Sequence, residues 1–235
     1  MSTTPQGEST GYPADVGSTP FMLTVRGRPS APSIEAARTV HNSTAGAPPS
    51  VAGARSLGDL SHNVYAGRGD ADGEVLFVDI WNSLGGLGQF FSNPQVQESA
   101  GQLFASRDAV VWRPADGYGN FHLALPAGQA VGAVGILRVA LGSTEKAGTA
   151  FGNYAAATIN QSRAYGLVSH SVWLRADGPG EPPSQEAFGL DLWADADRMD
   201  QFYELGVGFE HLGPVFAGAP ETATWRPAPG EWVEW

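Results

Sequence analysis

The sequence predicts an α+β fold: two tandem ferredoxin-like (βαββαβ) repeats whose antiparallel sheets pack into a single-chain α+β barrel. The first observation is a set of short motifs that occurs twice in the same order. The copies are Ser-His-Asn-Val at 61–64 and Ser-His-Ser-Val at 169–172, Val-Asp-Ile-Trp at 78–81 and Leu-Asp-Leu-Trp at 190–193, and Trp-Arg-Pro-Ala at 112–115 and 225–228. A period of roughly 110 residues greatly exceeds that of solenoid repeats, so it indicates a duplicated domain.

The second observation is the composition, and the third is the common order of elements in the two halves. Of the 235 residues, 42% are apolar and 16% are charged, which suits a packed core rather than a disordered chain. We therefore expect a disordered tail at 1–19, a first repeat at 20–115, a linker at 116–129 and a second repeat at 130–235.

The first repeat contains four apolar runs typical of strands and two helical regions between them. Its strands are predicted at 21–28, 60–66, 74–81 and 108–113. A helical region at 31–56 is interrupted by Ala47-Pro48-Pro49. A second helical stripe runs from Leu84 to Phe104, with a new first turn at Asn93-Pro94, because proline suits the first turn of a helix.

The second repeat shows the same pattern. Its strands are predicted at 131–141, 166–175, 186–193 and 221–226, with a proline-rich loop at 177–184 between the middle two. Its helices are predicted at 144–162 and, from the apolar side chains spaced along it, at 199–216.

The net charge of −11 and the residue usage exclude several classes of partner and chemistry. Lys146 is the only lysine, and no basic stripe is present to contact a polyanion, so neither nucleic acid nor an anionic membrane is an expected partner. The chain has no cysteine, which excludes disulfides, thiolate-bound metals and a cysteine nucleophile. No apolar run of membrane-spanning length and no secretory signal is seen, so we expect a cytoplasmic protein.

On its element order and repeated blocks, the chain resembles the dimeric α+β barrel superfamily over about residues 20–230. This superfamily includes antibiotic-biosynthesis monooxygenases and stress-responsive barrel proteins. The resemblance implies that each half covers the bare sheet face of the other, an internal pseudo-dimer; the whole chain could in addition form a homodimer. It also implies a pocket between the sheet and helices of each half that takes a small apolar or aromatic molecule. The repeated blocks match no catalytic motif of a named enzyme.

Strand parity predicts which side chains face the helices and which face the barrel interior. In the strand at 74–81, the aliphatic face is expected under the helices, so that Asp79 and Trp81 point into the barrel, as do Asp191 and Trp193. In the preceding strands, His62 and His170 are expected under the helices. Asn63, Tyr65 and Trp173 are expected in the barrel with the Asp and Trp residues, as substrate-binding candidates.

His62 and His170 are the candidates for acid–base catalysis, because the ordinary pKa of histidine lies near neutrality. Aligning the first helices places Asn42 over Asn153, so an Asn could meet the His in each half and orient a substrate carbonyl or hydroxyl. The competing interpretation is a buried His satisfied by a helix Asn or a backbone carbonyl. For Asp79 and Asp191, the competing interpretation is a bond to a Trp indole, an Arg or water.

Three functions remain open. The first is a cofactor-free, monooxygenase-like enzyme acting on an apolar or aromatic substrate, with no metal. The second is a non-catalytic barrel that binds a hydrophobic ligand or acts in a stress response. The third is haem binding, which some members of the superfamily perform. A two-His, one-carboxylate iron site is conceivable only if His62 or His170 lies next to an Asp.

Overall fold

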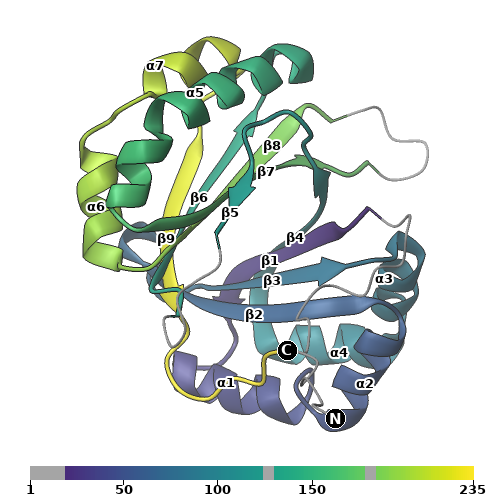
Figure 1. Ribbon diagram of the computed structural model, residues 1–235. Coiled ribbons are helices and arrows are strands. Elements are labelled where there is room, and N and C mark those ends of the chain that lie inside the picture. Colours follow the sequence, from purple (N-terminus) through teal and green to yellow (C-terminus); the bar gives the residue numbers. More distant parts are fainter. Residues whose placement is uncertain (1–18, 124–129, 178–183) are drawn as a thin grey trace, which may run out of the picture.

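The computed structural model describes residues 19–123, 130–177 and 184–235, in which the chain forms nine strands and seven α-helices (Figure 1). The predicted tail at 1–19 lies almost wholly outside the described residues. The elements of the first half are β1 (Phe21–Pro29), α1 (Ile34–Ser43), α2 (Pro48–Ser56), β2 (Asp59–Arg68), β3 (Val75–Trp81), α3 (Leu84–Phe91), α4 (Pro94–Leu103) and β4 (Phe104–Pro114). Those that follow are β5 (Phe121–His122), β6 (Ala133–Ala140), α5 (Thr144–Ala164), β7 (Leu167–Arg175), β8 (Glu186–Trp193), α6 (Ala196–Glu204), α7 (Phe209–Leu212) and β9 (Glu221–Pro227).

All strands belong to one antiparallel sheet that closes on itself. The strand order is β4-β1-β3-β2-β9-β6-β8-β7-β5, and a further pairing joins β4 to β7 and completes a ring. The first half contributes its strands in the order β4-β1-β3-β2, and the second contributes the corresponding strands in the same order, β9-β6-β8-β7. Helices α1–α4 lie outside the first four strands and α5–α7 outside the other four, on opposite sides of the molecule (Figure 1).

Local sequence signals set the helix ends. The side chains of Ser33, Asn93, Ser143 and Asp195 each accept a hydrogen bond from a first-turn backbone N–H of the helix that follows. Helix α4 begins on Pro94, as predicted, and α2 begins on Pro48, within the predicted interruption of the helical region. The predicted helix and strand regions are confirmed, with three differences. Phe104 starts β4 instead of ending a helix, the last helical region is split into α6 and α7, and the linker contains β5.

The interior of the ring is a core made by both halves. It contains Met22, Tyr65, Leu76, Val78, Val110, Trp112, Val134, Ile136, Phe188, Leu190 and Trp225. Separate cores lie between the strands and the helices of each half. Both faces of the sheet are therefore buried. No helix in the described part of the chain is both long enough and apolar enough to cross a membrane.

The predicted orientation of the second hairpin strand in each half is wrong. Leu76 and Val78 face the ring interior, whereas Phe77 and Trp81 pack under the helices. The strand pairing gives the reason: His62 lies directly opposite Asp79, so the two residues share one face of the sheet. His62 was placed correctly under the helices, and Asp79 must accompany it.

The same correction holds in the second half. His170 lies opposite Asp191, and Trp193 packs under α6. In each half the pairing shifts by one residue ahead of the His, between Asp59 and Ser61 and between Leu167 and Ser169. This irregularity changes which residues of the hairpin share a face.

Candidate functional site

Each half holds a histidine and an aspartate in direct contact on the helix-facing side of the sheet. His62 Nδ1 lies 2.6 Å from Asp79 Oδ1, and His170 Nδ1 lies 2.6 Å from Asp191 Oδ1. Both histidines are 5% exposed, so these pairs are sheltered from bulk water. A carboxylate at Nδ1 controls which tautomer the imidazole adopts, which is the arrangement found in hydrolytic triads.

In the first half, His62 is also bonded to a second histidine. His62 Nε2 lies 3.0 Å from His41 Nε2 of α1, and His41 Nδ1 lies 2.9 Å from Asn42 Oδ1. The segment after β9 fixes the orientation of the Asn42 amide. Asn42 Nδ2 donates to the carbonyl of Glu231, and Asn42 Oδ1 accepts from the backbone N–H of Val233.

These contacts determine which atom donates in each hydrogen bond that links Asn42, His41 and His62. Because Asn42 Oδ1 is an acceptor, His41 must donate through Nδ1, which leaves His41 Nε2 as an acceptor. His62 Nε2 therefore carries the proton between the two rings. Burial, with a smaller contribution from His62, lowers the pKa of His41 to about 4, which agrees with a neutral His41. The Nε2 atom of His62 is thus already used as a donor.

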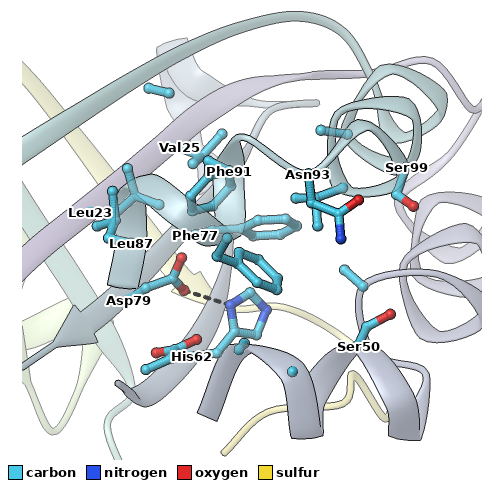
Figure 2. Close-up of a pocket in the computed structure, with 18 of the residues that line it drawn as sticks. Leu23, Val25, Ser50, His62, Phe77, Asp79, Leu87, Phe91, Asn93 and Ser99 are labelled. Carbon is cyan, nitrogen blue, oxygen red and sulfur yellow. Dashed lines mark hydrogen bonds and ion pairs between the residues drawn. The ribbon is translucent and has the colours of Figure 1, made fainter. Parts of the chain in front are cut away.

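A cavity of about 640 Å³ lies next to this pair, between the sheet and helices α2–α4; we call it the His62 pocket. Figure 2 shows His62 and Asp79 at its base beside the ring of Phe77, with Leu23, Val25, Leu87 and Phe91 along its apolar wall. The exposed residues Asn93, Gln95 and Gln97 also line it, so the cavity reaches the surface beside α4. The Trp235 ring lies 4.7 Å from the His62 ring and also borders the cavity.

Asp59 is a second carboxyl group in the wall of the His62 pocket. It is 5% exposed, and its Oδ1 atom has no hydrogen-bond partner among the described residues. Burial and the nearby Asp79 raise the pKa of Asp59 to about 8, against weaker opposing contributions from Ser61, Trp235 and Arg55.

In the second half the aspartate has a different set of partners. Tyr203 Oη donates to Asp191 Oδ2 over 2.9 Å, and the indole N–H of Trp193 donates to Tyr203 Oη over 3.2 Å. Asp191 thus accepts two hydrogen bonds, one from Tyr203 and one from His170. In this arrangement His170 Nδ1 carries the proton and donates it to Asp191 Oδ1, as in a carboxylate–imidazole pair of a hydrolytic triad. Burial, followed by the charge of Asp191, raises the pKa of Tyr203 well above its usual value, so Tyr203 keeps its proton.

The other ring nitrogen of His170 has no such partner. His170 Nε2 is buried and makes no hydrogen bond within the described residues. With Nδ1 protonated, Nε2 holds a free lone pair that can take up a proton. Leaving a buried acceptor unsatisfied costs about 1–3 kcal/mol, so this atom calls for a functional explanation.

A cavity of about 600 Å³ contains His170 in its wall; we call it the His170 pocket. Phe151 and Tyr154 of α5, together with Phe209 and Leu212 of α7, give it an apolar and aromatic lining. Its charged residues are mainly acidic: Asp70, Asp191, Asp200 and Glu204. Its one arginine among the described residues, Arg68, forms a salt bridge with Asp200.

Gly135 creates the space in which Tyr203 reaches Asp191. Gly135 pairs with Asp191 across the sheet, and a Cβ atom at this position would lie 2.1 Å from Tyr203 Oη. Any larger residue would therefore displace the tyrosine hydroxyl from the carboxylate.

The predicted partners of the histidines are only partly found. Asn42 is connected to His62 through hydrogen bonds to and from His41. Asn153, in contrast, is exposed and forms no hydrogen bond with His170 in the described structure. Tyr154 lies beside His170 instead, with 6.1 Å between ring centres. The prediction for Asn153 is wrong because Tyr154, the next position on α5, faces the sheet.

The residues predicted to line the barrel separate into two groups. Tyr65 and Trp173 pack in the ring interior as predicted, and Asn63 lies on the same face of β2 as Tyr65. The other four lie on the helix-facing side of the sheet: Asp79, Trp81, Asp191 and Trp193. The sequence offers Arg26, Arg113, Arg138 and Arg226 as possible partners of the aspartates, but none of them bonds to Asp79 or Asp191 in the described structure. Arg26 instead pairs with Glu74 and Glu221, and Arg138 with Glu186 and Asp108.

Four residues of these sites were not predicted from the sequence: His41, Asp59, Tyr154 and Tyr203. For His41, its position beside Asn42 was a usable signal, since one of two adjacent helix residues faces the sheet. Asp59 precedes the strand irregularity, which no pattern in the sequence reveals. Although His41, His62 and Asp79 are in contact, the two Nε2 atoms bond to each other, and no group of three or more ligating side chains in the described ranges is arranged to hold a metal ion.

Comparison with known proteins finds similarity in structure only. No protein-family model matches the chain, and no curated protein matches it in sequence. Among solved structures, an anthrone oxidase-like protein superposes with a TM-score of 0.65 at 11% identity, covering 92% of this chain and 94% of that one. A protein from Fusobacterium nucleatum subsp. nucleatum, whose name describes it as a monooxygenase, gives 0.59 at 10% identity, covering 93% and 98%.

A mutant chlorite dismutase from Candidatus Nitrospira defluvii superposes with a TM-score of 0.52 at 11% identity, covering 90% of this chain and 92% of that one. At 10–11% identity, the superpositions show that these proteins share a fold with this chain. The superpositions extend over nearly the whole of each chain, including both halves of the ring. The chain therefore shares the fold of these three proteins, in agreement with the fold that the resemblance predicts.

Proposed function

We propose that this protein is a small-molecule enzyme of the cofactor-independent, monooxygenase-like type, and that His170 is its general base. The observation that carries the proposal is the bare Nε2 atom of His170, held in the wall of an apolar cavity by the Asp191–Tyr203–Trp193 hydrogen-bond chain. We also propose that two repeats of common origin close one barrel, since the two halves share strand order and motifs.

The substrate class follows from the lining of the His170 pocket. Its aromatic side chains suit a flat apolar molecule, and its acidic residues disfavour an anion. The substrate must carry an acidic C–H or O–H group, such as a methylene between aromatic rings or a phenol. Because Nε2 has almost no exposed surface, the substrate reaches it only when a neighbouring ring moves, and Tyr154 is a pocket-lining ring beside His170, with 6.1 Å between ring centres.

His170 takes the substrate proton on Nε2, and Asp191 stabilises the resulting imidazolium through Nδ1. The substrate carbanion then reacts with molecular oxygen, and the peroxide anion formed takes the proton back from Nε2. His170 Nε2 then removes the second C–H proton, the O–O bond breaks with loss of hydroxide and formation of the carbonyl group, and hydroxide takes the proton from Nε2 to give water. For a methylene substrate the balance is R₂CH₂ + O₂ → R₂C=O + H₂O, with no external reductant.

Haem, the cofactor considered for this fold, does not fit the residues of the His170 pocket. A haem propionate needs a cationic partner, but the pocket's only arginine in the described residues is paired with Asp200 and the other charged side chains are acidic. His62 is not available as an iron ligand either, because its Nε2 atom is bonded to His41.

Oxygen consumption with a panel of anthrones, phenols and naphthols tests the proposal. We expect turnover of at least one compound, and loss of about 10²–10⁴-fold in kcat/KM in His170→Ala, the range that general base catalysis contributes. His62→Ala is the matched control and should retain most of the activity. Retention of full activity by a folded His170→Ala variant would refute the assignment.

A further inference from the structure

We propose that the His62 pocket is a separate binding site for a neutral aromatic ketone, in which the carboxyl group of Asp59 donates a hydrogen bond to the ligand's carbonyl oxygen. This site lies outside the His170 pocket and does not depend on His170 being a catalytic base. Three features carry the inference: the charge balance around Asp59, the chemistry of the cavity, and the contrast with the second half.

The charge balance follows from the hydrogen-bond directions. His41 is neutral, and His62 with Asp79 forms a pair of zero net charge, whether the shared proton sits on Nδ1 or on Oδ1. An ionised Asp59 would then be the cluster's only net charge, in a buried position without a bonded partner for Oδ1. Arg55 is the cation that acts on it, and Arg55 is exposed on α2. Burial of an uncompensated charge is costly, so Asp59 is a neutral carboxylic acid and can donate its O–H.

The cavity supplies the rest of the recognition. Its volume of about 640 Å³ lies within the usual range for small-molecule sites. The rings of Phe77, Trp81, Phe90, Phe91 and Trp235 line it, which suits a flat aromatic ligand. Among the described residues, its buried floor contains no positive charge that is not balanced by a bonded carboxylate, and the neutral acid offers a donor, so a carbonyl oxygen is the matching group on the ligand.

The second half provides an internal comparison. Asp59 pairs with Trp81 just before the strand irregularity, and Leu167 pairs with Trp193 at the equivalent place. The same backbone position therefore accepts a leucine in one half and a carboxyl group in the other. A fold requirement does not explain the carboxyl group, whose unpartnered Oδ1 atom costs stability.

The test compares two molecules of the same shape, 2-acetylnaphthalene and 2-isopropenylnaphthalene, in which a CH₂ group replaces the carbonyl oxygen. Binding is measured by quenching of tryptophan fluorescence, and the carbonyl stretching band of the bound ketone is recorded. We expect the protein to bind the ketone about tenfold more tightly than the alkene, the value of one hydrogen bond, and to lower the stretching frequency.

Four variants locate the interaction. Asp59→Asn keeps an N–H donor and should keep the preference for the ketone. Asp59→Leu, which copies Leu167, should bind both probes equally. Gly53→Leu should weaken both, because Gly53 lines the His62 pocket and a Cβ there meets open space. His170→Ala should change neither.

Three results would overturn the proposal. One is an unchanged ketone preference in Asp59→Leu, and another is failure of both probes to bind at their solubility limit. The third is ketone binding that His170→Ala weakens and Gly53→Leu does not, since the ketone would then occupy the other pocket. Thermal unfolding of each variant verifies that it is folded, and Asp59→Leu should be at least as stable as the parent at pH 7.

Discussion

The two His–Asp pairs have the same geometry on their Nδ1 side and opposite states on their Nε2 side. Both Nδ1 atoms lie 2.6 Å from an aspartate oxygen. His62 Nε2 donates to His41, whereas His170 Nε2 has no partner in the described structure. The presence of one helix residue, His41, thus decides whether the Nε2 atom of the imidazole is hydrogen-bonded or free to accept a proton. The comparison teaches that a His–Asp pair by itself does not identify a catalytic site.

The largest expected effect concerns the aspartates. In Asp191→Asn, the amide can donate to His170 Nδ1 and force the proton onto Nε2, which removes the base; kcat/KM should fall about 10⁴-fold, the loss that this tautomer reversal causes in a hydrolytic triad. In Asp79→Asn, the amide donates to His62 Nδ1 while Nε2–H still donates to His41, so activity should change less than about threefold. Equal losses in both variants, measured by oxygen uptake, would remove the distinction between the halves.

The pH dependence of stability should distinguish the first half from the second. The pKa of His41 is about 4 in the folded chain against an ordinary 6.5, so the folded state binds fewer protons between these values. The free energy of unfolding should therefore fall as pH drops from 6.5 to 4, by about 3 kcal/mol at most. His41→Gln, which can still accept from His62, should abolish this loss in thermal unfolding scans.

Asp59 should act in the opposite direction. Its pKa is raised from 3.8 to about 8, so the folded state binds more protons than the unfolded state in this window. Stability is therefore fully present at low pH and falls as pH rises towards 8. Asp59→Asn should remove this decline, and its melting temperature should exceed that of the parent most at pH 8. A constant difference from pH 5 to pH 8 would contradict the neutral Asp59.

The space provided by Gly135 is specific to the second pair. Gly135→Ala should lower the free energy of unfolding by about 1–3 kcal/mol, because its Cβ would collide with Tyr203 Oη. Gly189→Ala is the matched control in the neighbouring strand, since the nearest atom to its Cβ lies at 3.7 Å. In denaturant unfolding, Gly189→Ala should leave the free energy of unfolding nearly unchanged. If both variants lowered it equally, the collision with Tyr203 would not be the cause of the loss in Gly135→Ala.

The smallest expected effect is that of the tyrosine hydroxyl. Tyr203→Phe removes one hydrogen bond to Asp191 and leaves the indole N–H of Trp193 without its acceptor. The loss of about 1 kcal/mol should lower kcat/KM about fivefold and shift its pH profile, because Asp191 then stabilises the imidazolium differently. A purely structural tyrosine would leave the pH profile unchanged.

The sequence by itself determined the element order, the helix start at Asn93-Pro94, and the placement of His62 and His170 under the helices. These depend on local chemistry and periodicity, which a single chain displays. It did not determine the orientation of β3 and β8, because both faces of the sheet are buried and the aliphatic residues fit either one.

Only the tertiary structure decided which groups share a site. The register that runs unbroken from each histidine to the end of its hairpin pairs His62 with Asp79 and His170 with Asp191, and neither composition nor motif spacing reveals it. Helix packing then brings His41 to one pair and leaves the other open. Hydrogen-bond direction depends on contacts between distant segments, such as Asn42 with Val233, and it is these contacts that separate a saturated imidazole from a free one.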